Sequence, residues 1–377
     1  MHSEGFRPYV RLLTLAPVVA LLAIGPRIGL AQGNTGDVYV MTNQTSGNSI
    51  MVFHRDARGV LTSAGSYASG GNGAGTGADP LGSQGSLVLS EDERLLFTVN
   101  AGSSSVSVFA VSGDQLLLLN TAPSGGSMPV SVAVKHDLVY VVNAGGTPNI
   151  SGFKIEPHSN QLVPLTGSSQ NLPGGAAAAP AQVSFSPDGS VLVVTEKGTN
   201  LIDTFVLEDG IAQPGVSFPS SGTEPFGFAF AHDNAAIVSD VSGGTPGGSA
   251  VASYEVAGNG NLAVITPAVG DTQTAACWVV TTGNGKFAYT ANSASGTISS
   301  YAVSDGGGLS LLNVAAGSLG SGGAPIDMAL GRNSHFLFVR NAGNGSLSSF
   351  ALGADGSLTA VSTASGVPTG AQGVAAR

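Results

Sequence analysis

The sequence predicts an all-β fold, a seven-bladed β-propeller whose blades are four-stranded antiparallel sheets. The first observation is a motif that recurs seven times: a short apolar strand ends in Asn, Asp or Glu, a Gly/Ser turn follows, and a second strand ends in an aromatic residue. The second observation is the spacing of successive copies, which runs from 43 to 57 residues and is typical of propeller blades. The strand-ending residues, here called the polar anchors, are Asn43, Asn100, Asn143, Glu196, Asp240, Asn292 and Asn341.

The composition supports the same fold class. Of the 377 residues, 56 are glycine, 42% are hydrophobic and only 10% are charged. Such a chain is too apolar to be disordered, and its glycines interrupt it too often for long helices. Because sevenfold repetition closes one ring, we expect a single propeller domain over residues 32–377.

The unit around Glu196 shows how one blade divides into strands A to D. Strand A is predicted at Gln182–Phe185, strand B at Val191–Glu196 and strand C at Leu201–Val206. The sequence Ser186-Pro187-Asp188-Gly189 predicts the A–B turn, because proline fixes φ and glycine accepts the left-handed conformation.

The two ends of the sequence predict how the ring closes. The first unit begins directly with a strand B, Val38–Asn43, and has no strand A of its own. One segment, Gly370–Ala376, is left over after the last strand D and has the composition of a strand A. We expect this segment to complete the first blade and so to remove the open sheet edge.

Residues 1–31 have the pattern of a secretory signal peptide. Arg7 and Arg11 precede an apolar run at residues 12–24, and Gly29-Leu30-Ala31 offers small residues for cleavage. We therefore expect a secreted or periplasmic protein. The alternative is an uncleaved membrane anchor, for which the run is short.

The charge balance excludes nucleic-acid binding. The net charge is −10, and cleavage would remove three arginines and one glutamate, leaving 10 basic and 22 acidic residues and a net charge of about −12. Such a surface repels phosphates, and it disfavours a strongly anionic substrate unless a local basic pocket compensates.

The residues predicted to begin each strand A line the central channel. Ser86, Ser131 and Gly227 are small, but Gln182, Trp278, Asp327 and Gln372 are not. We expect Asp327, Trp278 and Gln372 to contact a substrate. Two long Gly-rich loops at residues 67–84 and 168–180 lie on the same face, and either carry a binding function or are solvent-exposed connections.

Gln182 and Glu196 are expected near each other at the channel mouth, because strand A begins and strand B ends on the same face. Glu196 is the only glutamate among the polar anchors, and a carboxylate at a pocket floor can act as a general base. The alternatives are that Glu196 caps the turn that follows it or pairs with Lys197.

Arg340 precedes the polar anchor Asn341, where the other blades have small or apolar residues. Such an arginine predicts a partner, which is either an oxyanion of the substrate or the carboxylate of Asp327. Asp327 could also help to hold a cation, although a single carboxylate is weak evidence for a metal.

The histidines and the cysteine argue against other chemistries. No histidine is placed to serve the channel mouth, so we expect neither a Ser-His-Asp triad nor a His-ligated metal, and no cofactor. Cys277 lies in an apolar run and is expected to be a buried structural thiol. His136, His232 and His335 are predicted in A–B turns. His158 is predicted in a C–D turn, and His54 just after a strand C.

At Pro180–Gly189, followed by Thr195-Glu196, the sequence resembles the lactonase propeller family of 6-phosphogluconolactonases and carboxymuconate lactonising enzymes. The resemblance covers the seven blades and is specific in the fourth. Active members have Pro-Arg-His before this turn; here Ala181 and Gln182 replace the Arg and His, and Pro180 and Glu196 match.

The resemblance implies a lactone hydrolase acting on a small lactone or a sugar-derived ligand, as a monomer. Glu196 would deprotonate a water molecule, Gln182 would orient it, and Arg340 would stabilise the oxyanion. The alternative is a non-catalytic binding or scaffold propeller, since Phe97-Thr98-Val99-Asn100 and Tyr289-Thr290-Ala291-Asn292 resemble the repeats of cell-surface propellers.

Overall fold

The computed structural model describes residues 1–2, 5, 34–75 and 77–377. The predicted signal peptide lies almost entirely outside these residues. The described chain from residue 34 onward belongs to one compact unit. Among the described residues, no helix is long and apolar enough to span a membrane.

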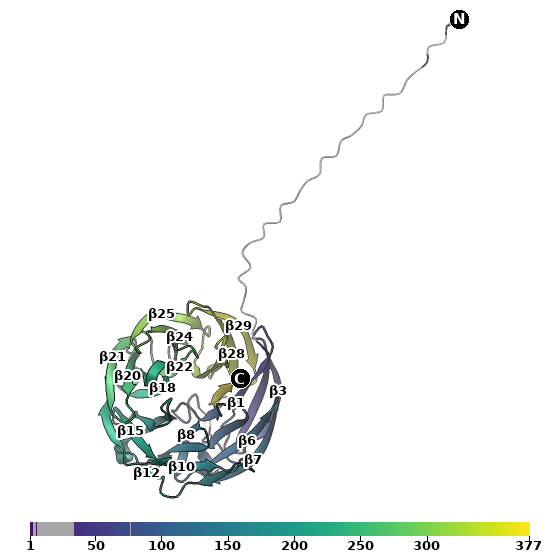
Figure 1. Ribbon diagram of the computed structural model, residues 1–377. Helices are drawn as coiled ribbons and strands as arrows, with labels where there is room; N and C mark the ends of the chain where they lie inside the picture. The colour runs from purple at the N-terminus through teal and green to yellow at the C-terminus, as the bar shows by residue number, and fades with distance from the viewer. Residues whose placement is uncertain (3–4, 6–33, 76) are drawn as a thin grey trace. The chain divides into compact units, whose positions relative to one another are not determined.

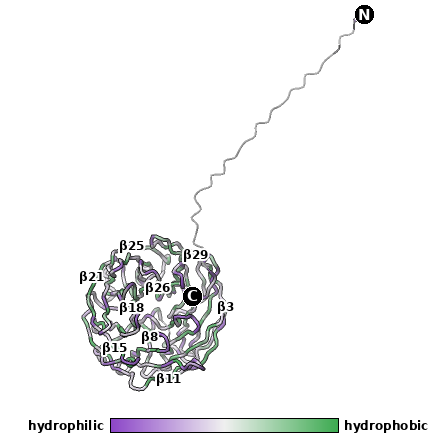
Figure 2. Tube along the Cα trace, in the orientation of Figure 1, coloured by the Kyte–Doolittle hydropathy of each residue, from purple (hydrophilic) through white to green (hydrophobic). Residues whose placement is uncertain are grey.

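Seven antiparallel sheets form a ring around a central channel, which confirms the predicted fold class (Figure 1). Middle strands such as Val191–Glu196 are nearly continuous apolar runs, which suits a sheet packed between two others, and Figure 2 shows hydrophobic and hydrophilic residues interspersed around the ring. In strand order A to D, blade 1 consists of β30 (Val374–Ala376), β1 (Gly36–Met41), β2 (Ser49–Arg55) and β3 (Leu61–Ala68), and blade 2 of β4 (Leu87–Leu89), β5 (Leu95–Asn100), β6 (Ser105–Ser112) and β7 (Gln115–Pro123). Blade 3 consists of β8 (Ser127–Lys135), β9 (Leu138–Gly145), β10 (Asn149–Ile155) and β11 (Leu162–Pro164), with β12 (Gln170–Asn171) also paired to β10. Blade 4 consists of β13 (Pro180–Phe185), β14 (Val191–Glu196), β15 (Leu201–Glu208) and β16 (Ile211–Ala212), with β17 (Val216–Pro219) also paired to β15.

The remaining three blades repeat the four-stranded pattern, and short 3₁₀ turns occur in the loops. Blades 5 to 7 are β18 (Pro225–Phe230), β19 (Ala235–Asp240), β20 (Ala250–Val256) and β21 (Leu262–Gly270); β22 (Ala276–Thr281), β23 (Phe287–Asn292), β24 (Thr297–Val303) and β25 (Leu309–Ser318); and β26 (Pro325–Leu330), β27 (Phe336–Asn341), β28 (Ser346–Leu352) and β29 (Leu358–Ser365). The 3₁₀ turns are η1 (Ala101–Ser103), η2 (Gly175–Ala177), η3 (His232–Asn234) and η4 (Ser242–Gly244).

The hydrophobic core lies between neighbouring blades. Phe97 of blade 2, Tyr140 of blade 3 and Phe205 of blade 4 are fully buried members of one cluster. Because both faces of a middle strand are covered by adjacent blades, β5, β14 and β27 are buried along their whole length.

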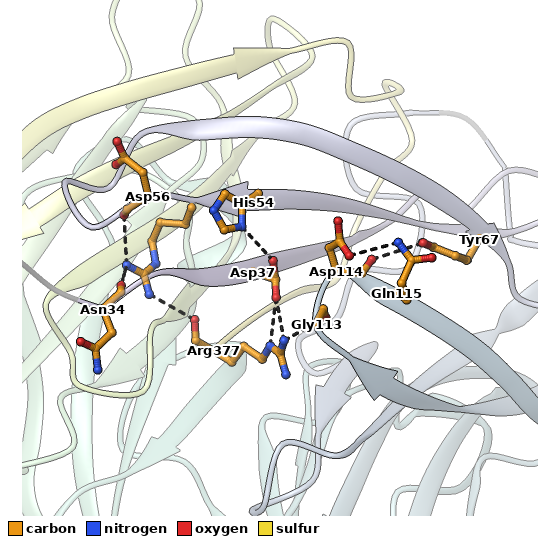
Figure 3. A network of polar contacts seen from close by, with 10 residues as sticks. Asn34, Asp37, His54, Asp56, Tyr67, Gly113, Asp114, Gln115 and Arg377 are labelled. Atoms are coloured by element: carbon orange, nitrogen blue, oxygen red, sulfur yellow. Dashed lines mark hydrogen bonds and ion pairs between the residues drawn. The ribbon is translucent and has the colours of Figure 1, made fainter.

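The ring closes as predicted, by pairing of the C-terminal strand β30 with β1. Val374 pairs with Val40, and Ala376 with Val38. Figure 3 shows the polar contacts at this closure: Arg377 pairs with Asp37 at 2.8 Å, and Arg55 donates to the carbonyl of Arg377 at 3.4 Å. The closing strand is shorter than the predicted Gly370–Ala376, because Gly370 belongs to a turn and residues 371–373 have no regular secondary structure.

A bulge recurs where strands A begin. The pairing of β13 with β14 shifts register between Pro180 and Gln182, and the other shifts of this kind lie at residues 129–131, 225–228, 276–278 and 325–328. A bulge adds one residue to one strand and turns the following side chains. It therefore decides which side chains of strand A reach the channel.

Candidate functional site

One end of the central channel is closed by the chain itself. The long loop between β3 and β4 contributes residues Asp79–Gln84, here called the closing segment, at the face where the strands A begin. Leu81, Ser83 and Gln84 are buried there. The Gly-rich loop that the sequence left as either a binding loop or a solvent-exposed connection thus packs against the channel strands.

Hydrogen bonds join the closing segment to several blades. The Ser83 hydroxyl donates to the carbonyl of Val130 at 2.8 Å, and the amide of Gln84 donates to the carbonyl of Ala181 at 3.1 Å. The carbonyl of Ser83 accepts from Trp278 Nε1 at 2.9 Å and from Gln372 Nε2 at 2.7 Å. Trp278 and Gln372, predicted to bind substrate, therefore use these polar groups to hold the closing segment.

The side chain of Gln84 bonds to the backbone of Val279, in place of a neighbouring strand. Its Nε2 donates to the carbonyl of Val279 at 2.7 Å, and its Oε1 accepts from the amide of Val279 at 2.9 Å. Gly227 makes room for this amide, because a Cβ at that position would lie 2.0 Å from Gln84 Oε1. The closing segment is thus fixed by side-chain as well as backbone contacts.

Glu196 is fully buried, and its carboxylate is occupied by the turn that follows its strand and by a neighbouring loop. Its Oε1 accepts from the amide of Gly174 at 3.0 Å, and its Oε2 accepts from the Thr199 hydroxyl. Burial and the adjacent Glu196 carboxyl raise the pKa of Asp203 far above its ordinary range. These contacts match the predicted turn-capping alternative, and the catalytic role of Glu196 stays a prediction.

Lys197 contacts the closing segment and does not pair with Glu196. Its ammonium donates to the carbonyl of Gly82 and lies 4.9 Å from the ring centroid of Phe226. Burial lowers its pKa, which the nearby Asp79 partly offsets.

Arg340 is fully buried and binds backbone carbonyls of the ring closure. Its guanidinium donates to the carbonyls of Asn341, Pro368 at 2.6 Å and Thr369 at 3.2 Å. Burial lowers its pKa to about 10. The expected alternative of an ion pair with Asp327 is not found among the described residues.

The other end of the channel holds a cavity of about 510 Å³. It extends from Gln84 at the closing segment to the A–B turns, where exposed residues such as Glu91 and Pro187 form the rim. Gln182 and Asp327 both line this cavity, whereas Glu196, Arg340, Trp278 and Gln372 do not. The structure therefore brings together two of the six predicted site residues.

Asp327 has the properties of a reactive carboxylate. Its backbone has the unusual φ of 62°, its side chain is 3% exposed, and its Oδ1 accepts from the amide of Met328 at 2.8 Å. Its Oδ2 has no hydrogen-bond partner among the described residues. Burial raises its pKa to about 7, against the lowering effect of nearby backbone amides. Strained backbone and a shifted pKa occur together at functional sites.

Gln182 lies in the same cavity, with its amide directed to blade 5. Its Nε2 donates to the carbonyl of Phe228 at 2.9 Å, and its Oε1 accepts from the amide of Phe228 at 2.7 Å. Because of the bulge between Pro180 and Gln182, Pro180 pairs with Glu196 and Gln182 pairs with Thr195. The side chain of Gln182 bonds to Phe228, whereas that of Glu196 bonds to Gly174 and Thr199. The predicted open mouth shared by Gln182 and Glu196 is thus replaced by a channel that opens on the opposite face.

The remaining sequence predictions concern residues outside the cavity. Cys277 is buried as expected, and burial raises its thiol pKa to about 12. The histidines predicted for the A–B and C–D turns lie in those turns. Within residues 34–75 and 77–377, no group of three or more His, Cys, Asp or Glu is arranged as metal ligands.

The sequence reasoning missed Gln84, which closes the channel, and the catalytic potential of Asp327. The sequence does contain a signal for the bulges. In four blades a proline stands two residues before the predicted start of strand A: Pro129, Pro180, Pro225 and Pro325. Proline inside a sheet is typical of bulges and edges. No comparable pattern in the Gly-rich loop indicates that its last residues fold inward.

Comparison with known proteins agrees with this architecture. The family model described as lactonase, seven-bladed β-propeller, matches residues 74–225 and 236–374. A provisionally assigned 6-phosphogluconolactonase from Bacteroides uniformis is 21% identical with a TM-score of 0.69, covering 90% of this chain and 99% of its own. The periplasmic gluconolactonase of Pseudomonas aeruginosa is 17% identical with a TM-score of 0.65, covering 90% and 98%.

A protein from Lactobacillus plantarum is 20% identical with a TM-score of 0.70, covering 91% of this chain and 99% of its own. No curated protein matches the sequence. At these identities the solved structures show a shared fold, whereas the family model covers well over half of the chain. The chain belongs to the lactonase family of seven-bladed β-propellers.

Proposed function

We propose that this protein hydrolyses a lactone in the channel cavity, with Asp327 as the general base. The observation that carries the proposal is that Asp327 lines a cavity of about 510 Å³ and has a buried Oδ2 without a hydrogen-bond partner among the described residues. Membership in the lactonase family supports the reaction class. A carboxyl with a pKa of about 7 is well matched to general-base catalysis near neutral pH.

In the proposed reaction, Asp327 removes a proton from water as the oxygen attacks the ring carbonyl. The tetrahedral intermediate then collapses with cleavage of the ring C–O bond, and the proton passes from Asp327 to the departing alkoxide. The product is an open-chain hydroxy acid. Gln182 Nε2 uses one N–H for the carbonyl of Phe228, so its second N–H is the donor proposed for the oxyanion.

Export remains part of the proposal. The signal-peptide pattern of residues 1–31 supports a secreted or periplasmic enzyme, and a periplasmic gluconolactonase is among the proteins of similar fold. We propose a monomer, because the propeller completes its own ring through β30.

A binding or scaffold function is the second candidate, and one observation favours it. The face on which catalysis was predicted is covered by the closing segment, and Glu196 and Arg340 are engaged in protein contacts. A propeller without turnover would use its rims and loops to bind a ligand.

The test is hydrolysis of a lactone panel by residues 32–377 and by two variants. Asp327→Asn keeps the size of the side chain but cannot accept a proton, so we expect a loss of kcat of at least about 100-fold. Glu196→Gln is the comparison, since it removes the originally predicted base. Loss of turnover in Glu196→Gln but not in Asp327→Asn would place the chemistry on the covered face, and no turnover with any lactone would favour the binding function.

A further inference from the structure

We infer that the lactone taken by the channel cavity is uncharged and has a hydrocarbon body, and that it is neither a phosphorylated nor an unmodified sugar lactone. This inference rests on the proposed function for its reaction, but its basis is the chemistry of the cavity wall.

The first argument is charge. The ionisable residues that line the cavity are Glu91, Lys135 and Asp327. Lys135 Nζ lies 2.6 Å from Glu91 Oε1 at the rim, so its charge is already matched. A phosphate or carboxylate group would enter without a free cation and would approach the Asp327 carboxylate, which is unfavourable in a partly desolvated site.

The second argument is hydrogen bonding. The polar side chains of the wall are largely engaged with the protein: Gln84 binds Val279, Gln182 binds Phe228, and Thr281 donates to the carbonyl of Phe230 at 2.6 Å. A sugar lactone would bury several hydroxyl groups that lose their water partners here. Each buried hydroxyl without a partner is unfavourable.

The third argument is the apolar wall. Strands A of blades 2, 3, 5 and 6 present small apolar residues to the cavity, and blade 4 presents Ser184; the apolar residues are Val88, Ala133, Ala229 and Val280. The residues before them on each strand, such as Leu87 and Phe228, belong to the hydrophobic core between blades and also border the cavity. This ring of small side chains creates the space.

Larger apolar residues surround the ring of small ones. Leu89, Phe185, Phe230 and Leu330 line the cavity nearer the A–B turns. An alkyl or aryl substituent of a lactone would be covered by these side chains on its way to Asp327. Burial of each additional methylene group should raise affinity by about fourfold until the cavity is filled.

Two measurements test the inference on residues 32–377. The first is kcat/KM for δ-lactones with unbranched alkyl substituents of increasing length, beside glucono-δ-lactone and its 6-phosphate. The second is calorimetric binding of the matching alkyl δ-lactams, which resist hydrolysis and so report binding without turnover. We expect both quantities to rise with chain length and the two sugar compounds to be poor ligands.

Two variants locate the effect. Ala229→Phe would fill the cavity and should abolish lactam binding. Glu91→Gln frees Lys135, so it should raise kcat/KM for the phosphorylated lactone several-fold relative to kcat/KM for the alkyl lactones. Glu255→Gln removes an exposed charge elsewhere and is the matched control.

The outcomes separate this inference from the proposed function. Preferred hydrolysis of a sugar or phosphorylated lactone by the unmodified protein would overturn the inference and leave the lactonase function standing. Chain-length-dependent lactam binding without hydrolysis of any lactone would support the cavity chemistry and overturn the function. Absence of both lactam binding and hydrolysis would overturn the two together.

Discussion

Three aspartates, Asp203, Asp240 and Asp327, are buried inside the propeller with carboxyl groups that resist ionisation. Burial raises the pKa of Asp240 to about 7 and that of Asp327 to about 7, from an ordinary value of 3.8. Asp203 shifts in the same direction, chiefly through burial and additionally through Glu196. Between pH 3.8 and about 7 the folded protein therefore binds more protons than the unfolded chain.

The first prediction concerns stability against pH. Because the folded state holds these protons more tightly, the free energy of unfolding should fall as pH rises from about 4 to 8, by an amount on the order of a few kcal/mol. Asp203→Asn carries a neutral amide in place of the carboxyl and should be more stable than the unmodified protein at pH 8, with a shallower pH dependence. Urea unfolding at pH 5 and pH 8 measures both effects.

The exposed Asp305→Asn removes the same formal charge in a surface turn and serves as the control. Equal pH dependence in Asp203→Asn and the unmodified protein would show that the Asp203 carboxyl is ionised in the folded state across this range.

At the scale of one element, the closing segment is a loop whose residues Leu81, Ser83 and Gln84 are buried like those of the core. Its backbone and its Gln84 side chain bond with strands A of different blades, whose edges converge too tightly on the axis for regular pairing. Trp278, the only tryptophan of the chain, bonds directly to this segment. Its fluorescence is therefore a reporter of the closure.

The second prediction uses Gly227. In Gly227→Ala, the added methyl group would collide with Gln84 Oε1 and lies 2.7 Å from the carbonyl of Cys277. We expect a loss of about 2–4 kcal/mol in unfolding free energy and a red shift of the Trp278 emission as the segment loosens. Gly306→Ala is the control, because nothing lies within 4 Å of its added Cβ; equal behaviour of the two variants would contradict a fixed closing segment.

How far the sequence predicts each element depends on what its pattern encodes. Strand β14 matches its predicted bounds because apolar runs and the Pro-Asp-Gly turn are local signals. Gln182 reaches the channel as predicted, since strand A lines it. The hydrogen-bond partners of Glu196 could not be predicted, because a one-residue bulge does not change the hydrophobic pattern of the sequence. The closure by Gln84 could not be predicted either, because Gln84 and its partner Val279 are 195 positions apart.

For the whole molecule, stability depends on joining the last blade to the first. Arg340 binds the carbonyls of Pro368 and Thr369 just before β30, and Arg377 pairs with Asp37 just after it. A ring that opened here would expose the edge of β1 that β30 now covers. Arg340 thus has a clear structural role at the ring closure.

The third prediction follows from that role. Arg340→Met keeps much of the volume but leaves buried carbonyls without donors, so the unfolding free energy should fall by about 2–4 kcal/mol. In the folded protein, kcat should stay within a few-fold of the unmodified value. The exposed Arg58→Met is the control, and a large loss of kcat with unchanged stability would restore Arg340 as the oxyanion-binding residue.

The closing segment also fixes how molecules exchange with the cavity. A propeller channel open at both ends could admit substrate at one rim and release product at the other. Here the described residues leave one way in and out, past Glu91 and Lys135. In the proposed reaction each hydroxy acid would have to depart before the next lactone arrives, and accumulated product should compete with fresh substrate for the same passage.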